Sequence, residues 1–231
     1  MIYRILNAIK TGGLAYYSLL PFSLGCHSLD LFKDLKVGQS ELVRVLDFIA
    51  GEEKDCAWIP EYPIITDLIR EMGLAVGCEL GVAYGGQSKY FLENTQVNKL
   101  YSVDPYQHFS TAEWNDGGNF EQIVLDAMFL KVQYALKPFG DRSVLLRETS
   151  KEASERFHNN ALDFVYIDAN HEYSHVLEDL SLWYSKVRSG GLVAGDDYVV
   201  WPSVALAVKE FTNKHGIHYQ VQGNKWWFVK K

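Results

Sequence analysis

From residue 64 to the C-terminus, short apolar runs alternate with longer stretches in which apolar residues recur at helical spacing. The short runs are rich in branched residues and are bounded by turn formers, which is typical of buried strands. We expect strands at 74–80, 99–104, 143–147, 162–168 and 191–196. We expect helices at 64–72, 88–93, 120–136, 150–157, 174–187 and 204–215. Strands that alternate with helices form a mostly parallel sheet, so the sequence predicts an α/β fold with helices on both faces of the sheet.

The C-terminal stretch departs from this alternation. Residues 217–222 and 225–230 flank Gly223 and Asn224, a pair that favours the two-residue turn of a β-hairpin. The hairpin brings the predicted sheet to seven strands and places antiparallel strands at one of its edges.

The N-terminal quarter lacks the alternation. Residues 40–49 have helical spacing, and we expect residues 1–60 to form a helical cap or lid on a main domain at 61–231. Residues 11–29 carry no charge and follow two basic residues, which resembles a signal peptide. Gly12, Gly13, Pro21 and several polar residues make this run too weakly apolar for a membrane helix. A lid or a dimer arm is therefore favoured over targeting or membrane association, which stays the alternative.

The composition excludes several classes of function. A chain of 231 residues with 48% hydrophobic and 22% charged residues suffices for one well-cored domain with an appendage. The net charge of −7 argues against a nucleic-acid partner, since such proteins usually present a basic face. The densest basic group, Lys225, Lys230 and Lys231, is expected to be a solvated tail. Three widely separated cysteines indicate neither a disulfide framework nor a zinc site, which favours a reducing, cytoplasmic location.

A glycine-rich turn follows the first predicted strand. The strand ends at Glu79, and Gly81, Gly85 and Gly86 then allow the backbone to turn tightly beneath a ligand. The next helix offers free N–H groups at its start. The spacing is not the GxGxxG fingerprint that seats a pyrophosphate, which disfavours a nicotinamide-dependent oxidoreductase. A purely structural turn is the alternative.

The second predicted strand ends at Asp104, 25 residues after Glu79. An acid at this point can accept hydrogen bonds from the 2′- and 3′-hydroxyls of a ribose. Nucleoside binding without pyrophosphate recognition fits both the glycine turn and the acid.

The pattern Glu79-x-Gly81-x-x-x-Gly85, followed by Asp104, resembles the class I S-adenosylmethionine-dependent methyltransferases, whose sheet is Rossmann-like. The resemblance covers residues 64–231. It implies that S-adenosyl-L-methionine is the cofactor and that the first acid and the glycine turn contact its methionine and ribose parts. The cofactor contacts that we expect are Glu79, Gly81, Gly85, Gly86, Ser88, the ribose-binding Asp104, the adenine-contacting Thr149 and Ser150, and Asp168.

Three further acids follow the fourth and fifth predicted strands: Asp168, and 28 residues later the adjacent Asp196 and Asp197. The pattern resembles the cation-dependent O-methyltransferases, such as the catechol and caffeoyl-CoA enzymes. It is still more similar to the macrolide and aminocoumarin sugar O-methyltransferases. The resemblance implies a Mg²⁺ or other divalent cation on these three acids, since Mg²⁺ prefers oxygen ligands and keeps positions open for substrate oxygens. Alternatively, only Asp168 and one of the pair are ligands, or the acids cap turns or bind the cofactor.

His171 lies three residues after Asp168. The unperturbed pKa of a histidine, about 6.5, suits a general base that removes the proton of a hydroxyl. An N-cap or packing role is the alternative. The nearby rings of Tyr106, His108, Trp114 and Trp201 could stack on a ligand or anchor loops.

These features together predict an O-methyltransferase with His171 and Asp168 as catalytic residues. A hydroxyl of a sugar, glycan or similar small molecule is the expected acceptor, and a catechol-like phenol is the second choice. A non-catalytic cofactor-binding protein is the rival from another class, because the fold alone does not establish activity. We expect no nucleic-acid or membrane partner, and the N-terminal segment could make a homo-oligomer.

Overall fold

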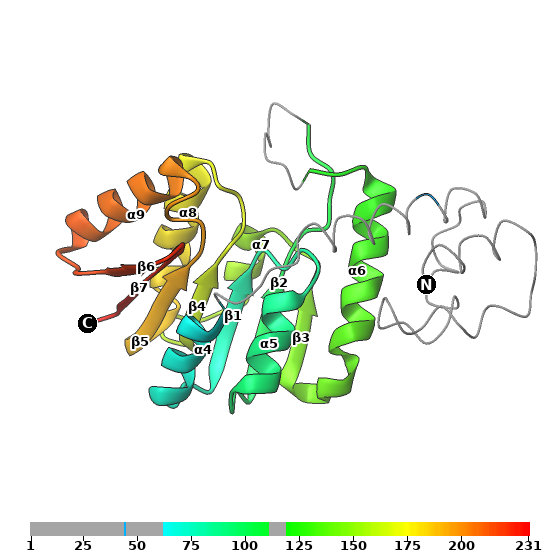
Figure 1. Cartoon of the computed structure of the whole chain (residues 1–231), viewed down its shortest axis with the longest axis horizontal. Helices are drawn as coiled ribbons and strands as arrows, with labels where there is room; N and C mark the ends of the chain where they lie inside the picture. Colours follow the sequence, from blue (N-terminus) through cyan, green and yellow to red (C-terminus); the bar gives the residue numbers. More distant parts are fainter. Residues whose placement is uncertain (1–43, 45–61, 111–118) are drawn as a thin grey trace, which may run out of the picture.

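The computed structural model describes residue 44, residues 62–110 and residues 119–231, and a seven-stranded sheet runs through its centre (Figure 1). The strands are β1 (Val76–Leu80), β2 (Lys99–Val103), β3 (Ser143–Leu146), β4 (Leu162–Ile167), β5 (Val187–Gly195), β6 (Gln220–Gln222) and β7 (Lys225–Val229). Their order is β3-β2-β1-β4-β5-β7-β6. Strands β1 to β5 are parallel, whereas β7 is antiparallel to both β5 and β6. The predicted mostly parallel sheet with an antiparallel C-terminal hairpin is confirmed.

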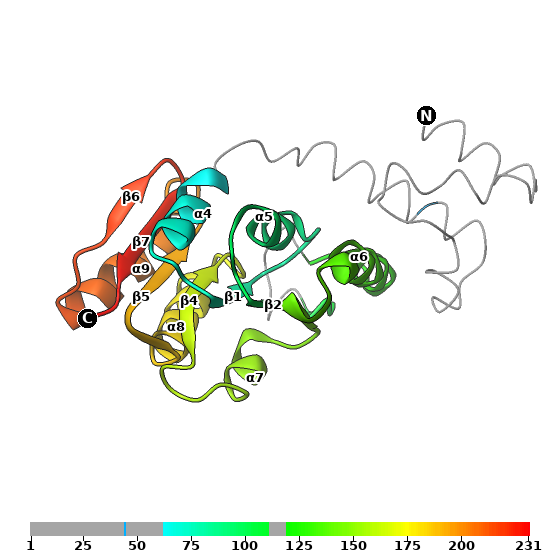
Figure 2. The ribbon, with the colours of Figure 1, turned by 90° about the horizontal axis from the view of Figure 1, so that it is seen from below.

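Helices cover both faces of the sheet. They are α4 (Tyr62–Glu71), α5 (Gly86–Asn94), α6 (Gln122–Leu136), α7 (Ser150–Ser154), α8 (Tyr173–Tyr184) and α9 (Pro202–His215), with a 3₁₀ segment η3 (Lys137–Arg142) before β3. Figure 2 shows α4, α5 and α6 on one face and α7, α8 and α9 on the other. No helix in the described part of the chain is long and apolar enough to cross a membrane.

The alternation of side chains along β4 explains the two layers. Phe164 and Tyr166 pack beneath α4 to α6, where the ring of Phe91 meets both edge-on. Val165 and Ile167 point the other way, into a second core beneath α7 to α9. Because both faces of the sheet are buried here, residues 164–167 of β4 form a continuous apolar run.

The predicted elements are present, with shifted ends. Strand β5 begins at Val187, whereas the prediction began it at Gly191, because Val187 pairs with Leu162 before the register shifts. Gly190, at φ 75°, lies within that irregularity. The helix before it accordingly ends at Tyr184 and not at residue 187. The expected cap over residues 1–60 and the ring of Trp114 lie outside the described residues, apart from Arg44.

The expected solvated tail is wrong for Lys225. This lysine opens β7, and only 2% of it is exposed. Lys230 is also engaged, since its Nζ donates to the carbonyl oxygens of Val187 and Tyr184 at 2.7 and 3.0 Å. Charged residues near the end of a sequence suggest exposure to solvent, but Lys225 opens and Lys230 directly follows a strand that pairs with β5.

A buried polar network joins α7 to α8. The hydroxyl of Ser150 donates to the carboxyl group of Asp179 and accepts the indole N–H of Trp183 at 2.8 Å. Burial raises the pKa of Asp179 to about 7, and the hydrogen bond from Ser150 only partly opposes it. Asp179 is therefore largely protonated in the folded protein below neutral pH.

Asp179→Asn should make folding stability less dependent on pH. A raised folded pKa means that the wild type loses stability as pH rises from about 4 to about 7, by up to about 4 kcal/mol. The amide has no such titration, so the variant should gain on the wild type across that window in urea unfolding. Glu155→Gln, at the exposed end of α7, is the control and should change stability by less than about 0.5 kcal/mol at every pH. A parallel pH profile for Asp179→Asn and wild type would contradict this reading.

Candidate active site

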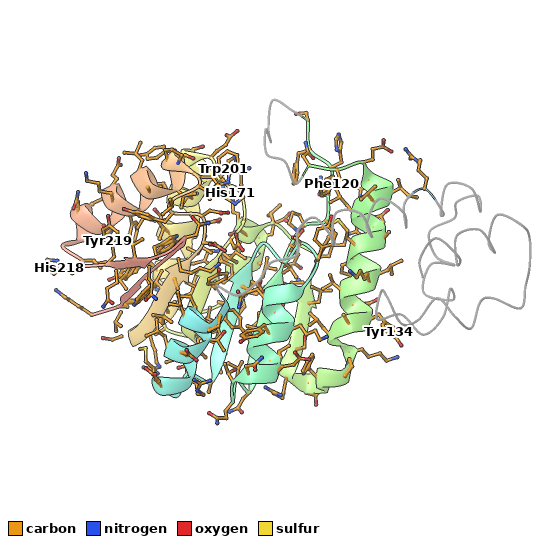
Figure 3. The ribbon with its side chains drawn as sticks, viewed as in Figure 1. Phe120, Tyr134, His171, Trp201, His218 and Tyr219 are labelled. Carbon is orange, nitrogen blue, oxygen red and sulfur yellow. The ribbon has the colours of Figure 1, made fainter. Side chains whose placement is uncertain are left out.

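The candidate site lies where β1, β2, β4 and β5 end, at the carboxyl edge of the sheet. The adjacent central strands β1 and β4 continue into connections that lead to opposite sides of the sheet, which is where ligands bind in open α/β sheets. Backbone hydrogen bonds from Gly81 to Val103 and from Asp168 to Leu80, at 2.9 and 2.8 Å, tie the three strand ends together. Figure 3 shows His171 and Trp201 side by side at this edge.

The glycine turn passes very close to the end of β4. Gly81 has φ 82°, and a Cβ atom there would lie 1.9 Å from the carbonyl oxygen of Asp168. Only glycine fits this approach without moving the backbone of β4. Gly85 is the N-cap of α5, and Gly86 is its first residue. The turn after β1 therefore approaches the end of β4 with backbone atoms and no side chain at Gly81.

Glu79 is buried at the end of β1, with 1% exposed. Burial raises its pKa to about 8, although the hydroxyl of Ser88 donates to its carboxyl group. Ser88 also shares a 2.6 Å hydrogen bond with Ser102. The hydroxyl of Ser88 is therefore engaged with Glu79 and Ser102, and the predicted contact of Ser88 with a cofactor stays a prediction.

Asp104 joins the glycine turn to the loop after β2. Its Oδ2 accepts the backbone N–H groups of Val82 and Ala83, both at 3.0 Å, and its Oδ1 accepts that of Tyr106 at 2.8 Å. Burial raises the pKa of Asp104, and these three hydrogen bonds oppose that shift. Three of about four carboxylate lone pairs are used, which leaves capacity on Oδ1 for one further donor.

Tyr106 is a buried anchor of this loop, one of the two roles considered for the rings. Its hydroxyl donates to the carbonyl oxygen of Ala83 at 2.9 Å. Both residues have positive φ, 42° and 45°, which is unusual for residues with side chains. His108 is likewise engaged, because its Nδ1 lies 2.9 Å from the carbonyl oxygen of Phe120.

The hydroxyls of Thr149 and Ser150 are used within the protein. Thr149 is the N-cap of α7 and forms a capping box with Glu152. Ser150 belongs to the network with Asp179 and Trp183. The predicted adenine contact thus remains a prediction, and in this arrangement it would fall to the backbone of these residues.

Asp168, His171 and Asp197 come together, and each offers a ligand atom within 4.8 Å of the others. The Nε2 of His171 lies 2.6 Å from Oδ2 of Asp197 and 4.0 Å from Oδ1 of Asp168. Burial, followed by the charges of Asp196 and Asp197, raises the pKa of Asp168 well above its usual value, while Lys225 and His171 oppose the shift. Two carboxylates and an imidazole are a donor set that suits a divalent cation.

Asp196 does not join this group. Its Oδ2 forms a buried ion pair with Nζ of Lys225 and accepts the hydroxyl of Tyr166 at 3.2 Å. Its Oδ1 accepts the backbone N–H of Asp197 at 2.8 Å. Of the three predicted metal ligands, Asp168 and Asp197 belong to the group with His171, and Asp196 is engaged elsewhere. The cation itself stays a prediction.

Asn224, in the turn between β6 and β7, holds Asp197 in place. Its Nδ2 donates to Oδ1 of Asp197 at 2.8 Å, and its Oδ1 accepts the N–H groups of Val199 and Val200. Asp197 has φ 64°, a left-handed conformation that directs Oδ2 to His171. Sequence reasoning found the turn at Gly223 and Asn224 but missed that it supports the site.

His171 is fixed from three sides. Besides Asp197, the indole of Trp201 stacks on the imidazole, with ring centroids 5.1 Å apart and an angle of 4°. The hydroxyl of Ser203 donates to the carbonyl oxygen of His171 at 2.6 Å. The N-cap of α8 is Glu172, so the N-cap role considered for His171 does not apply.

Two buried amide groups have no hydrogen-bond partner for their nitrogen among the described residues. They are Nε2 of Gln87, in the first turn of α5, and Nδ2 of Asn170, between Asp168 and His171. Unpaired buried donors are rare in proteins and call for an explanation such as a ligand. Sequence reasoning missed both residues as site candidates, since nothing in the sequence distinguishes a buried amide from an exposed one.

The protein family that the sequence matches is consistent with the geometry of this site. A family model described as a methyltransferase domain matches residues 78–198, more than half of the chain. Uncharacterized protein R132 of Acanthamoeba polyphaga mimivirus is 24% identical over 121 residues, which are 52% of this chain and 50% of that protein. The match thus spans about half the length of this curated relative.

Solved structures share the fold. An O-methyltransferase from Bacillus cereus in complex with SAH has a TM-score of 0.58 at 13% identity, over 100% of both chains. The O-methyltransferase TomG from Streptomyces achromogenes, in complex with SAM, has a TM-score of 0.56 at 13% identity, over 87% of this chain and 94% of that one. Spermidine synthase from Thermotoga maritima has a TM-score of 0.51 at 15% identity, over 74% of this chain and 60% of that one. At such identities the likeness concerns the fold alone.

The matched family segment runs from β1 to just past β5. It therefore contains the glycine turn, Asp104 and the group around His171. The resemblance to the class I methyltransferases is confirmed, and the chain belongs to the family of methyltransferase domains.

Proposed function

We propose that this protein is an S-adenosylmethionine-dependent O-methyltransferase that acts on a hydroxyl of a sugar, a glycan or a similar small molecule. The observation that carries the proposal is the place of His171, held by Asp197 and stacked on Trp201, at the same sheet edge as the glycine turn. A base beside a nucleoside-type site suits transfer of a group from a nucleoside-bound donor to an acceptor hydroxyl.

The residues on the β1 and β2 side fit the cofactor. Gly81 leaves room for close approach, Asp104 retains an acceptor position for a ribose hydroxyl, and Gln87 offers a buried unpaired donor. Glu79 can accept the ammonium of the methionine part. When bound, S-adenosylmethionine supplies the electrophilic methyl group. The protein's task on this side is to hold that group in line with the acceptor oxygen.

The residues on the β4 and β5 side fit the acceptor. His171 would take the proton of the acceptor hydroxyl as its oxygen forms the bond to the methyl carbon and the carbon–sulfur bond breaks. Asp197 orients the imidazole and stabilises the imidazolium that forms. Asp168 and Asp197 would hold a divalent cation, which supplies orientation of the acceptor and a lower hydroxyl pKa when bound. Trp201, 40% exposed, offers a flat apolar surface of the kind that suits a sugar ring.

For residues 1–60, most of which lie outside the described part of the chain, the proposal follows the expectation from the sequence. Residues 1–60 would form a cap or lid that covers the site, or an arm of a homo-oligomer. A cytoplasmic location and a small-molecule or glycan acceptor complete the proposal, without a nucleic-acid or membrane partner.

The test is formation of S-adenosylhomocysteine (SAH) when the full chain is incubated with S-adenosylmethionine, Mg²⁺ and a panel of glycosides and catechols. We expect turnover with glycosides, and turnover with catechols alone would move the acceptor to phenols. S-adenosylmethionine, and not NAD, should raise the melting temperature. Cofactor binding without turnover of any acceptor would favour a non-catalytic binding protein.

A separate experiment tests the divalent cation. Adding EDTA should abolish turnover, and excess Mg²⁺ should restore it. Turnover that is unaffected by EDTA would contradict the proposed need for a divalent cation.

His171→Gln should lower kcat by about 10² to 10⁴ because the acceptor proton loses its base. The dissociation constant for SAH, measured by calorimetry, should stay within about twofold, since the residues that we assign to the cofactor are unchanged. His175→Gln, one turn further along α8, is the matched control and should keep wild-type turnover. Equal activity of the His171 variant and its control would remove the base from the mechanism.

Glu79 should make cofactor binding dependent on pH. Its pKa of about 8 in the free protein means that binding a cationic ligand beside it must displace a proton near neutral pH. Affinity for S-adenosylmethionine should therefore rise between pH 5.5 and 7.5, by up to about tenfold per pH unit. This pH range lies below the ordinary pKa of the ligand's amino group, so the ligand keeps its positive charge throughout. Calorimetry in buffers of different ionisation enthalpy would count the released proton.

Glu79→Gln should bind the cofactor with no such pH dependence. Glu93→Gln, on the exposed side of α5, should behave as the wild type. If the Glu79 variant keeps the wild-type pH dependence, Glu79 does not face the cofactor's charge.

A further inference from the structure

A lysine and an aspartate form an ion pair inside the site. The side chains of Lys225 and Asp196 are 3% and 4% exposed, and Nζ of Lys225 contacts Oδ2 of Asp196. The ammonium also lies 5.8 Å from the ring centroid of Tyr166. Taking two charges out of water costs several kcal/mol per ion, so a buried pair is weak evidence for a role in stability. The position of the pair, at the end of β5 beside His171 and Asp197, suggests a role in the site.

The ion pair leaves Asp196 little capacity for another ligand. Its Oδ2 has both Lys225 and Tyr166 as partners, and its Oδ1 accepts the N–H of Asp197 at 2.8 Å. Three of about four carboxylate lone pairs are therefore used, and a cation on the fourth, at Oδ1, would lie close to the ammonium that is already buried against Oδ2. The two positive charges would repel each other in a poorly solvated place.

Asp197 and Asp168 are arranged differently. Asp197 points away from the pair, toward His171 and Asn224. Among the described residues, Asp168 has His171 as its ion-pair partner, at 4.0 Å, and about a quarter of its side chain is exposed. These two carboxylates therefore remain open to a ligand on the side of His171.

We propose that Lys225 is a positioning residue that withholds Asp196 from divalent cations, so that Asp168 and Asp197 are the only carboxylates among the described residues that a cation at this site can use. The inference rests on the cation of the proposed function, but it is independent of the acceptor. It departs from the three-aspartate set that the family resemblance implies.

The consequence is a change in charge. Three free aspartates would place three negative charges around a cation, whereas Lys225 cancels one and leaves two. Cation affinity follows the number of charged ligands and the rigidity of the site. Lys225 thus makes this a weaker cation site than the bare sequence of acids suggests.

Titration of the full chain with Mn²⁺, followed by electron paramagnetic resonance of the free ion, tests this without acceptor or turnover. Asp196→Asn alone would leave the Lys225 ammonium unpaired beside the cation, so the charge-neutral double variant Lys225→Met/Asp196→Asn tests the role of Asp196. It should leave the dissociation constant within about threefold, because Asp196 is not a ligand, and its SAH affinity shows that it is folded. Asp197→Asn is the matched neighbour and should weaken binding by about tenfold or more. Lys225→Met should tighten binding by about tenfold, since it releases a third carboxylate.

The inference is overturned if the double variant Lys225→Met/Asp196→Asn weakens Mn²⁺ binding as much as Asp197→Asn does. It is also overturned if Lys225→Met, folded by its SAH affinity, binds Mn²⁺ no tighter than the wild type. If Lys225→Met does not fold, the comparison of the double variant with Asp197→Asn decides. Absence of Mn²⁺ binding in both wild type and Lys225→Met overturns the inference as well, while SAH binding and turnover still judge the methyl transfer separately.

Discussion

Negative charge at the carboxyl edge of the sheet is the constraint on which the site depends. Five carboxyl groups meet there: Glu79, Asp104, Asp168, Asp196 and Asp197. Burial makes their mutual repulsion costly, so each needs a proton, a donor or a cation. Glu79 keeps a proton near neutral pH, and Asp104 is stabilised by three backbone N–H groups. Both arrangements use the same few residues of the glycine turn and its helix, which explains why the turn is held so closely against the strand ends.

The negative charges of the three remaining acids are compensated to different extents. Lys225 neutralises Asp196, while His171 and Asn224 engage Asp197. Asp168 keeps a strongly raised pKa because burial and its two neighbouring acids outweigh Lys225 and His171. The part of the edge that still needs a proton or a cation thus lies between the glycine turn and His171. A positively charged sulfonium or a divalent cation would relieve it, so the electrostatics favour cationic ligands at the place where the proposed reaction needs them.

The sequence was sufficient for the parts of the site that strand endings determine. Glu79 lies near the end of β1, Asp104 and Asp168 directly follow β2 and β4, and His171 comes three residues after Asp168. Locating the strands therefore located these residues. Side-chain partners across the fold could not be predicted in this way. The hydroxyls of Ser88, Thr149 and Ser150 bind protein groups because helix caps and buried acids compete for them locally. The burial of Lys225 depends on the register of β7 against β5, which no pattern within either strand reveals.

The antiparallel direction of β7 explains how the C-terminal hairpin reaches the site. Because β7 runs opposite to β5, its first residues pair with the last residues of β5, as Trp226 does with Gly195. The preceding Asn224 and Lys225 therefore reach Asp197 and Asp196. A further parallel strand would have begun at the opposite edge of the sheet and brought only its end to the site. The hairpin turn thus supplies an amide and an ammonium where parallel strands contribute mainly acids, and the reversal of one strand sets the two adjacent aspartates to different tasks.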